Sequence, residues 1–324
     1  MFEMYAECRP TPTECHLQAT LLEVKMNTRL SSLSGIALAV LFPLSLAGQA
    51  ICTAPHSSPT LSQGGSISTL APGGGWAQIS LYRQRSVSGF NRNGDRQEFL
   101  AQSEFLTRSV FLTASMGVVE GLDVWAQMPI HNLDVVSDGG NSESSGAGDV
   151  RFAARVSSEM FGFESPVGLR FRAKFPTSTF PVDATVLPLT EGQRDFEIAL
   201  ESGRAFDFLP IYMVGWVGYR WRGKNERTSY VPGGERFGHL AVGGSVDALT
   251  WEIGADGLWG GAPEVNGFRL ADAEARRFFQ IVPTVGYGVG PGTVEVSVQI
   301  PLAGRNLPTG AGIGVGYRTT WGLF

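Results

Sequence analysis

Period-two alternation is the feature that most constrains the fold of this chain. From Trp76 to Phe324, segments of about 9–12 residues alternate apolar and polar side chains, with turn residues between them. In VRFAARV, which starts at Val150, every second residue is apolar, and Arg151 and Arg155 fall on the other face. The segments VGLRFRAKF and TVEVSVQI follow the same pattern. The alternation predicts an all-β chain from residue 76 onward.

The lengths of the connections add a second constraint. About twelve candidate strands begin near residues 76, 103, 122, 148, 166, 193, 210, 237, 249, 275, 293 and 312. The long, polar connections are 87–102, 134–147, 177–192, 223–236, 260–274 and 302–311, and the short ones are 117–121, 158–165, 205–209, 247–248 and 288–292. In an up-and-down meander all long connections fall at one end, and both termini lie at the other. Short periplasmic turns, long outer loops and an even strand number are typical of outer-membrane barrels, whereas a soluble β-sandwich has no reason to sort its loops.

The predicted fold is therefore a transmembrane, up-and-down antiparallel β-barrel with its apolar face outward. Hydrocarbon offers no water to backbone N–H and C=O groups, so a spanning sheet must close on itself. Aromatic residues gather near the long loops (Phe175, Tyr219, Trp221, Trp259) and near the short turns (Phe161, Phe163, Phe206, Phe208, Tyr287). Two such groups fit the interfacial girdles of a barrel, although a sandwich core would also be rich in aromatics.

The first 50 residues are predicted to be an upstream extension followed by a secretory signal peptide. Positive charge at Lys25 and Arg29 precedes an apolar run from Ile36 to Leu46, and Gly48-Gln49-Ala50 has the form of a cleavage site. The apolar run is too short to span ~30 Å of hydrocarbon as a helix. Met26 is an alternative start. Residues 51–75, rich in Ser, Thr, Pro and Gly, are predicted to be a flexible tail that precedes the barrel at 76–324.

The composition of the chain excludes several classes of protein. Apolar residues make up 43% of the chain and charged residues 17%, which excludes a disordered protein. A net charge of −5 excludes a generally basic nucleic-acid binder, and three cysteines are too few for a disulfide scaffold. Together with the barrel prediction, this places the chain in the outer membrane of a Gram-negative bacterium. The expected partners are membrane lipid, lipopolysaccharide and a small-molecule solute.

If the apolar faces meet lipid, the alternate residues line the lumen. The predicted lumen-lining and selectivity residues are Asp123, His131, Arg151, Arg155, Arg170, Arg172, Lys174, Asp195, Glu197, Glu201, Glu252 and Asp256. Because the fifth and sixth predicted strands are antiparallel neighbours, Arg170, Arg172 and Lys174 are expected to face Glu201, Glu197 and Asp195 respectively. These charges either form an ion-pair network that fills the lumen or set up a transverse field that selects solutes. Both interpretations of these charges stay open. A barrel of about twelve strands is expected to have a narrow lumen, which favours small solutes.

Catalytic chemistry has little support. The sequence lacks a Cys/His cluster with metal spacing, a GxSxG elbow and an HExxH motif, and we expect neither enzyme activity nor a cofactor. Ser115, His131 and Asp123 form one candidate hydrolase set, with nothing local to support it. The apolar, proline-containing loop 177–192 either folds inward as a plug or gate, or contacts lipopolysaccharide.

Two places fit the barrel pattern less well. Extending the apolar face of the second strand backward turns Arg108 and Glu104 toward lipid, so the strand is expected either to end near Ser109 or to contain a bulge. At the C-terminus, Phe324 is the expected contact of the barrel-assembly machinery. It lies one position out of phase with the apolar series that contains Tyr317 and Trp321.

Short motifs resemble a family of outer-membrane barrels associated with meta-pathway phenol degradation. They are MGVVEGLDVWAQMP (116–129), GAGDVRFAARV (146–156) with VGLRFRAKFPT (167–177), and IPLAGRNLPTG (300–310) with GVGYR (314–318). Members of that family are regarded as transporters, so the resemblance implies a barrel that handles small aromatic or hydrophobic compounds.

The sequence thus favours an outer-membrane channel or facilitator for small solutes, aromatic or hydrophobic ones included, with a narrow charged lumen. The alternatives are a structural or adhesion barrel that does not transport and, less favoured, an outer-membrane lipid hydrolase.

Overall fold

The computed structural model describes residues 69–99, 103–137, 140–163, 165–181, 186–206 and 210–322. The predicted signal peptide, most of the predicted tail and Phe324 lie outside the described residues. Among the described residues no helix is long and apolar enough to cross a membrane.

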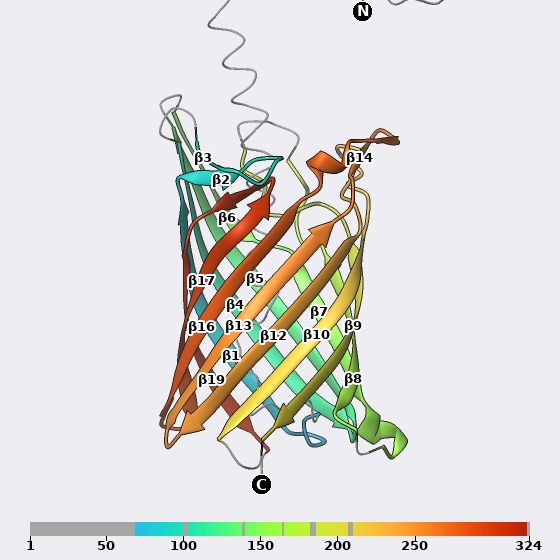
Figure 1. Ribbon diagram of the computed structural model, residues 1–324, viewed down its shortest axis with the longest axis vertical. Helices are drawn as coiled ribbons and strands as arrows, with labels where there is room; N and C mark the ends of the chain where they lie inside the picture. The colour runs from blue at the N-terminus through green and yellow to red at the C-terminus, as the bar shows by residue number, and fades with distance from the viewer. Residues whose placement is uncertain are drawn as a thin grey trace, which may run out of the picture. The chain divides into compact units, whose positions relative to one another are not determined.

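The described chain forms a closed antiparallel barrel, and the predicted fold class is confirmed (Figure 1). Its twelve strands are β1 (Gly75–Ser86), β4 (Glu104–Val119), β5 (Leu122–Ser137), β7 (Val150–Ser157), β8 (Val167–Phe175), β9 (Asp195–Ala205), β10 (Ile211–Arg222), β12 (Glu235–Val246), β13 (Leu249–Gly260), β16 (Arg277–Val289), β17 (Gly292–Arg305) and β19 (Gly312–Trp321). The barrel closes because β1 pairs with both β4 and β19.

Several predicted long loops contain regular structure. The connection expected at 134–147 is wrong, because β5 continues to Ser137 and pairs with β6 (Gly140–Ala147). One small sheet joins β2 (Ser88–Phe90), β3 (Arg96–Glu98) and β18 (Leu307–Thr309), and another joins β11 (Tyr230–Val231), β14 (Glu264–Val265) and β15 (Phe268–Arg269). Two short 3₁₀ helices, η2 (Ser158–Phe161) and η3 (Asp272–Glu274), complete the connections. These small sheets pair backbone groups of the long loops with one another.

The second predicted strand neither ends at Ser109 nor bulges where expected. β4 runs without interruption from Glu104, and its register with β5 shifts only between Gly117 and Val119, next to the short turn. Glu104 and Arg108 do face outward, and each forms an ion pair there, Glu104 with Arg85 at 2.7 Å and Arg108 with Asp134 at 3.0 Å. Ion pairing near the long-loop end satisfies these charges without a change of register.

Residues 69–74 make specific contacts at the short-turn end, ahead of the boundary predicted at residue 76. Leu70 is buried, and its backbone N–H donates to Oδ2 of Asp123 at 3.3 Å. The N–H of Gly73 donates to the carbonyl of Gly117, and the N–H of Gly117 donates to the carbonyl of Gly74, both at 2.9 Å. The segment just before β1 is thus hydrogen-bonded to the inner wall.

The outer wall is apolar, as a lipid-facing surface requires. The most exposed side chains on the strands include Val217 and Val246, at 62% and 59%, and Trp221 and Trp259 lie near the long-loop end at 53% and 52%. Polar and charged side chains, by contrast, dominate the buried set on the inner face. The protein is therefore apolar outside and polar inside, the arrangement of a transmembrane barrel.

A charged side chain on this outer wall should lower the free energy of unfolding more at the middle of the membrane than near its edge. Val217 lies in the middle of β10, whereas Val246 ends β12 beside a short turn. We expect Val217→Arg to lower the free energy of unfolding by about 2–4 kcal/mol and Val246→Arg by about 0–1 kcal/mol. Guanidinium unfolding in lipid vesicles measures both, and equal losses at the two positions would contradict the placement of the wall in the membrane.

Candidate functional site in the barrel lumen

The strands place the predicted lumen residues on the inner face. Nine of them are buried, and Arg155, Arg170 and Arg172 are half-buried. The three ion pairs expected between β8 and β9 are present: Arg170–Glu201 at 2.6 Å, Arg172–Glu197 at 3.0 Å and Lys174–Asp195 at 2.9 Å. The contacts thus form between adjacent strands, the arrangement expected of an ion-pair network in the lumen.

The other predicted lumen residues have partners of their own. Arg155 pairs with Asp123 at 2.6 Å, and Glu252 accepts a hydrogen bond from the Tyr212 hydroxyl at 2.7 Å. Arg151 donates to Oε1 of Gln127 at 2.9 Å. No carboxylate of the described residues pairs with Arg151, which is 4% exposed. Arg151 is thus a buried cation without an acidic partner in the described part of the chain.

The opposite sector of the lumen, formed by β17, β19, β1, β4 and β5, is mostly neutral. Most of its buried polar side chains are hydroxyls and amides, namely Gln78, Ser80, Tyr82, Gln84, Thr107, Ser109, Thr113, Gln127, Ser297 and Gln299. Its two buried carboxylates are paired, Asp123 with Arg155 at 2.6 Å and Glu295 with Arg318 at 3.1 Å. On β19, Gly312, Gly314 and Gly316 occupy the inward positions, and a Cβ at Gly312 would come within 2.2 Å of the Tyr82 hydroxyl. The inward glycines of β19 therefore make room for the side chains of Tyr82, Ser297 and Gln78.

The loop between β8 and β9 folds inward at the long-loop end, which is one of the two alternatives expected for it. Leu187 is 5% exposed and packs with Phe105 of β4 and Leu133 of β5, and Leu189 packs against the same cluster. Thr190 is completely buried. The described part of this loop thus has an apolar contact with one side of the barrel and, through the residues that follow, a charged contact with the other.

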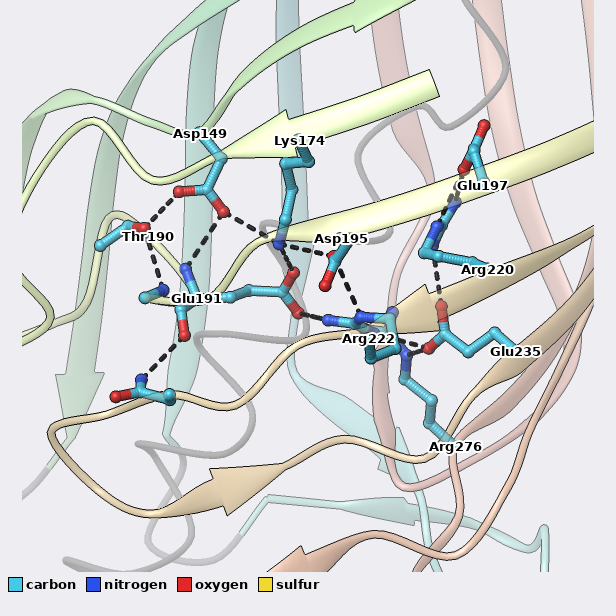
Figure 2. Close-up of polar contacts among 12 residues, drawn as sticks. Asp149, Lys174, Thr190, Glu191, Asp195, Glu197, Arg220, Arg222, Glu235 and Arg276 are labelled. Carbon is cyan, nitrogen blue, oxygen red and sulfur yellow. Dashed lines mark hydrogen bonds and ion pairs between the residues drawn. The ribbon is translucent and has the colours of Figure 1, made fainter. Parts of the chain in front are cut away.

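Glu191 is the loop's charged contact (Figure 2). Its carboxylate binds Lys174 of β8, Arg222 of β10 at 2.5 Å and Arg276, just before β16, at 3.7 Å. Beside it, Asp149 accepts hydrogen bonds from the Thr190 hydroxyl and from the Glu191 backbone N–H. One carboxylate of the loop therefore joins three cations from different parts of the wall.

These contacts continue into the lumen as a balanced network. We call it the mouth network; its cations are Arg172, Lys174, Arg220, Arg222 and Arg276, and its anions are Asp149, Glu191, Asp195, Glu197 and Glu235. Glu235 pairs with Arg220 at 2.8 Å, with Arg222 at 2.7 Å and with Arg276. The side chains of Arg222 and Glu235 are 0% and 1% exposed. Charges buried this deeply are tolerated only when they are paired and hydrogen-bonded.

Sequence reasoning missed six of the ten residues of the mouth network. Arg220 and Arg222 alternate with Tyr219 and Trp221, so the period-two rule would have turned them inward. Glu235 begins β12 and could have been found in the same way. Asp149, Glu191 and Arg276 lie beside the strands, and no local pattern identifies them.

Two tryptophans of the lumen, Trp216 and Trp125, each have an arginine side chain over the face of the ring. Arg170 lies over Trp216 at 5.0 Å from the ring centroid, and His239 stacks on the same ring at 3.9 Å. Arg172 lies over Trp125 at 5.4 Å. A cavity of about 20 Å³ next to Trp216 and another of about 10 Å³ near Arg151 have room for roughly one water each.

The candidate hydrolase set does not assemble. The Ser115 hydroxyl donates to the carbonyl of Val124, and Asp123 binds Arg155. Nδ1 of His131 instead contacts the Ser109 hydroxyl at 2.7 Å. The predicted nucleophile, base and orienting acid thus each have other partners.

A family model described as "Putative MetA-pathway of phenol degradation" matches residues 87–317. The chain belongs to this family. No curated protein matches the sequence. Among solved structures, the COG4313 outer membrane channel from Pseudomonas putida F1 is 14% identical, with a TM-score of 0.66 over 81% of this chain and 99% of that one. The barrel thus has the fold of an outer-membrane channel.

Two further solved structures are less similar to this chain. The CymD monoaromatic hydrocarbon channel is 9% identical over 85% of this chain and 93% of its own, with a TM-score of 0.41. The translocator domain of the autotransporter NalP from Neisseria meningitidis is 11% identical over 90% and 98%, with a TM-score of 0.43.

Proposed function

We propose that this protein is an outer-membrane channel for small solutes, aromatic or hydrophobic ones included, and that the loop between β8 and β9 is its gate. The observation that carries the proposal is Glu191, a loop carboxylate held inside the mouth of a closed barrel by three cations. A barrel that serves only as a scaffold has no need for a buried, charge-balanced contact between a long loop and its inner wall. A gate needs a contact that is stable when closed and can be exchanged for water when open.

The solute path runs along the neutral sector. Most of its buried polar side chains are neutral hydroxyls and amides, and its two carboxylates, Asp123 and Glu295, are each paired with an arginine. Trp125, which lies on β5 of this sector, offers a ring face to an aromatic solute once Arg172 moves aside. The family's description, which refers to phenol degradation, agrees with a solute of this kind.

Solute uptake tests the proposal. Cells that lack other channels for the solute should take up a radiolabelled monoaromatic compound faster when they produce this protein, and the purified protein should conduct ions in planar bilayers. A structural or adhesion barrel predicts neither effect. Conductance without uptake of the aromatic compound would support a channel but contradict the proposed class of solute.

Arg151 is expected to set the charge preference of the open channel. Replacing this buried cation with glutamine removes a positive charge that no described carboxylate compensates, so Arg151→Gln should reduce anion over cation permeability severalfold. Reversal potentials in a salt gradient measure the ratio. Arg236→Gln removes an exposed arginine from the outer side of β12 and should leave the ratio unchanged; equal shifts in both variants would contradict a role for Arg151.

A further inference from the structure

Two outward arginines lie side by side near the long-loop end of the barrel. Arg83 of β1 and Arg108 of β4 are direct partners in the strand register, and both are exposed. Like charges at such positions repel each other. Arg108 contacts Asn132 at 2.7 Å and Asp134 at 3.0 Å, whereas Arg83 has no ion pair with any residue in the described ranges. Glu104, the carboxylate that interacts electrostatically with Arg83, is already paired with Arg85 at 2.7 Å, so Arg83 keeps its donors free of an ion pair within the described residues.

Acidic residues are missing from the row that holds these arginines. In register order the row reads Ile313, Arg83, Arg108, Asn132 and Ser145. The carboxylates of this part of the wall, Glu104, Asp134 and Glu143, occupy higher rows, nearer the loops. The row closest to the apolar wall is thus basic and polar.

An apolar groove of about 530 Å³ lies against this row. Its floor includes Leu81, Val110 and Ile130, which form one continuous row across β1, β4 and β5, with Val315 of β19 opposite Leu81. Leu81 and Ile130 are 57% and 40% exposed. Because this row is two residues from the arginine row, the two lie roughly 7 Å apart along the strands.

We propose that this groove binds the lipid A part of lipopolysaccharide, with a phosphate between Arg83 and Arg108 and an acyl chain along the apolar floor. Guanidinium groups bind phosphate through paired N–H donors, and a phosphate between the two arginines would relieve their repulsion. The long-loop end is the outer side of such barrels, where the outer leaflet lies. A second copy of the chain fits poorly, because twofold pairing through this face would bring four arginines together. The proposal depends on the barrel's place in the membrane and not on transport.

Lipid binding by the purified, full-length protein in detergent tests the site. Native mass spectrometry with a bis-phosphorylated lipid A should show binding to the wild-type protein and about tenfold weaker binding to the Arg83→Gln/Arg108→Gln variant. The matched control Arg236→Gln, on an outer wall position of β12, should bind as the wild type does. Circular dichroism checks that each variant keeps its strands.

Further ligands and one further variant separate the possible sources of binding. Dephosphorylated lipid A and phosphatidylglycerol should bind at least tenfold more weakly than lipid A, and inorganic phosphate should not displace it at equal concentration. Val110→Trp, which fills the groove but keeps both arginines, should weaken binding of lipid A. Equal binding by the double arginine variant, equal binding of phosphatidylglycerol or the dephosphorylated lipid, displacement by phosphate, or unchanged binding by Val110→Trp would each overturn the proposal.

Discussion

Replacing Glu191 with glutamine is expected to open the channel. The substitution keeps the size of the side chain but removes the charge that Lys174, Arg222 and Arg276 share. These cations keep other carboxylates, since Lys174 still contacts Asp149 and Asp195, so the wall of the barrel should stay intact. If the loop loses about 2–3 kcal/mol of its contact with the wall, the open-to-closed ratio rises by roughly 30- to 150-fold. Open probability in planar bilayers measures this directly.

Glu201→Gln is the matched control for the gate. Glu201 is a buried carboxylate of β9 that pairs with Arg170, and no described contact joins it to the loop. Its replacement should change the open probability far less than that of Glu191. If the two variants behave alike, or if Glu191→Gln has the open probability of the wild type, the loop contact does not gate the barrel.

The largest loss of stability is expected at Glu235. Its carboxylate accepts from Arg220, Arg222 and Arg276, and its side chain is 1% exposed. Glu235→Ala leaves these arginines with one anion fewer in a buried place, and removing one partner of a buried ion pair costs about 3–5 kcal/mol. Urea unfolding of the protein in lipid vesicles, followed by tryptophan fluorescence, measures the free energy of unfolding.

Glu226→Ala is the comparison for that loss. Glu226 pairs with Lys224 at 3.3 Å, but its side chain is 80% exposed, and pairs of this kind contribute about 0–1 kcal/mol. If Glu235→Ala lowers the free energy of unfolding no more than Glu226→Ala does, water reaches the mouth network. Breaking its ion pairs would then cost no more than breaking an exposed pair.

The strands could be predicted from the sequence because a barrel in a membrane is governed by local rules. Lipid on one side and polar lumen on the other impose a period of two, and loop length reports the side of the membrane. The same rule gave the β8–β9 pairs, since the partners of Arg172 and Lys174 follow from the order of neighbouring strands. Arg170 reaches Glu201 diagonally, because Glu201 is opposite Gly168 in the register.

The gate could not be predicted in the same way. Glu191 contacts Arg222 of β10 and Arg276, which precedes β16, and no local pattern links these two residues to the loop. The pattern of loop 177–192 indicated apolar residues at an exposed end, which fits both an inward fold and contact with lipopolysaccharide. Packing of Leu187 against Phe105 and Leu133 decides between them, and that contact depends on how far β4 and β5 extend above the short strands β7 and β8. The length of β5 was itself underestimated, because near its end Leu133 and Val135 turn inward toward the loop while Asn132 and Asp134 face outward, so the outward-apolar alternation stops.

A reversible crosslink between loop and wall tests the gated channel most directly. The side chains of Asp149 and Thr190 are hydrogen-bonded, so cysteines at both positions, in a background without the native cysteines, can be joined by a disulfide or a short cleavable thiol reagent. Conductance and solute uptake should fall to the background level when the loop is crosslinked and return when the link is cleaved. Flux that is unchanged by the crosslink would show that solutes do not pass the loop. A lack of flux in the crosslinked, cleaved and Glu191→Gln proteins alike would show that this barrel is not a channel.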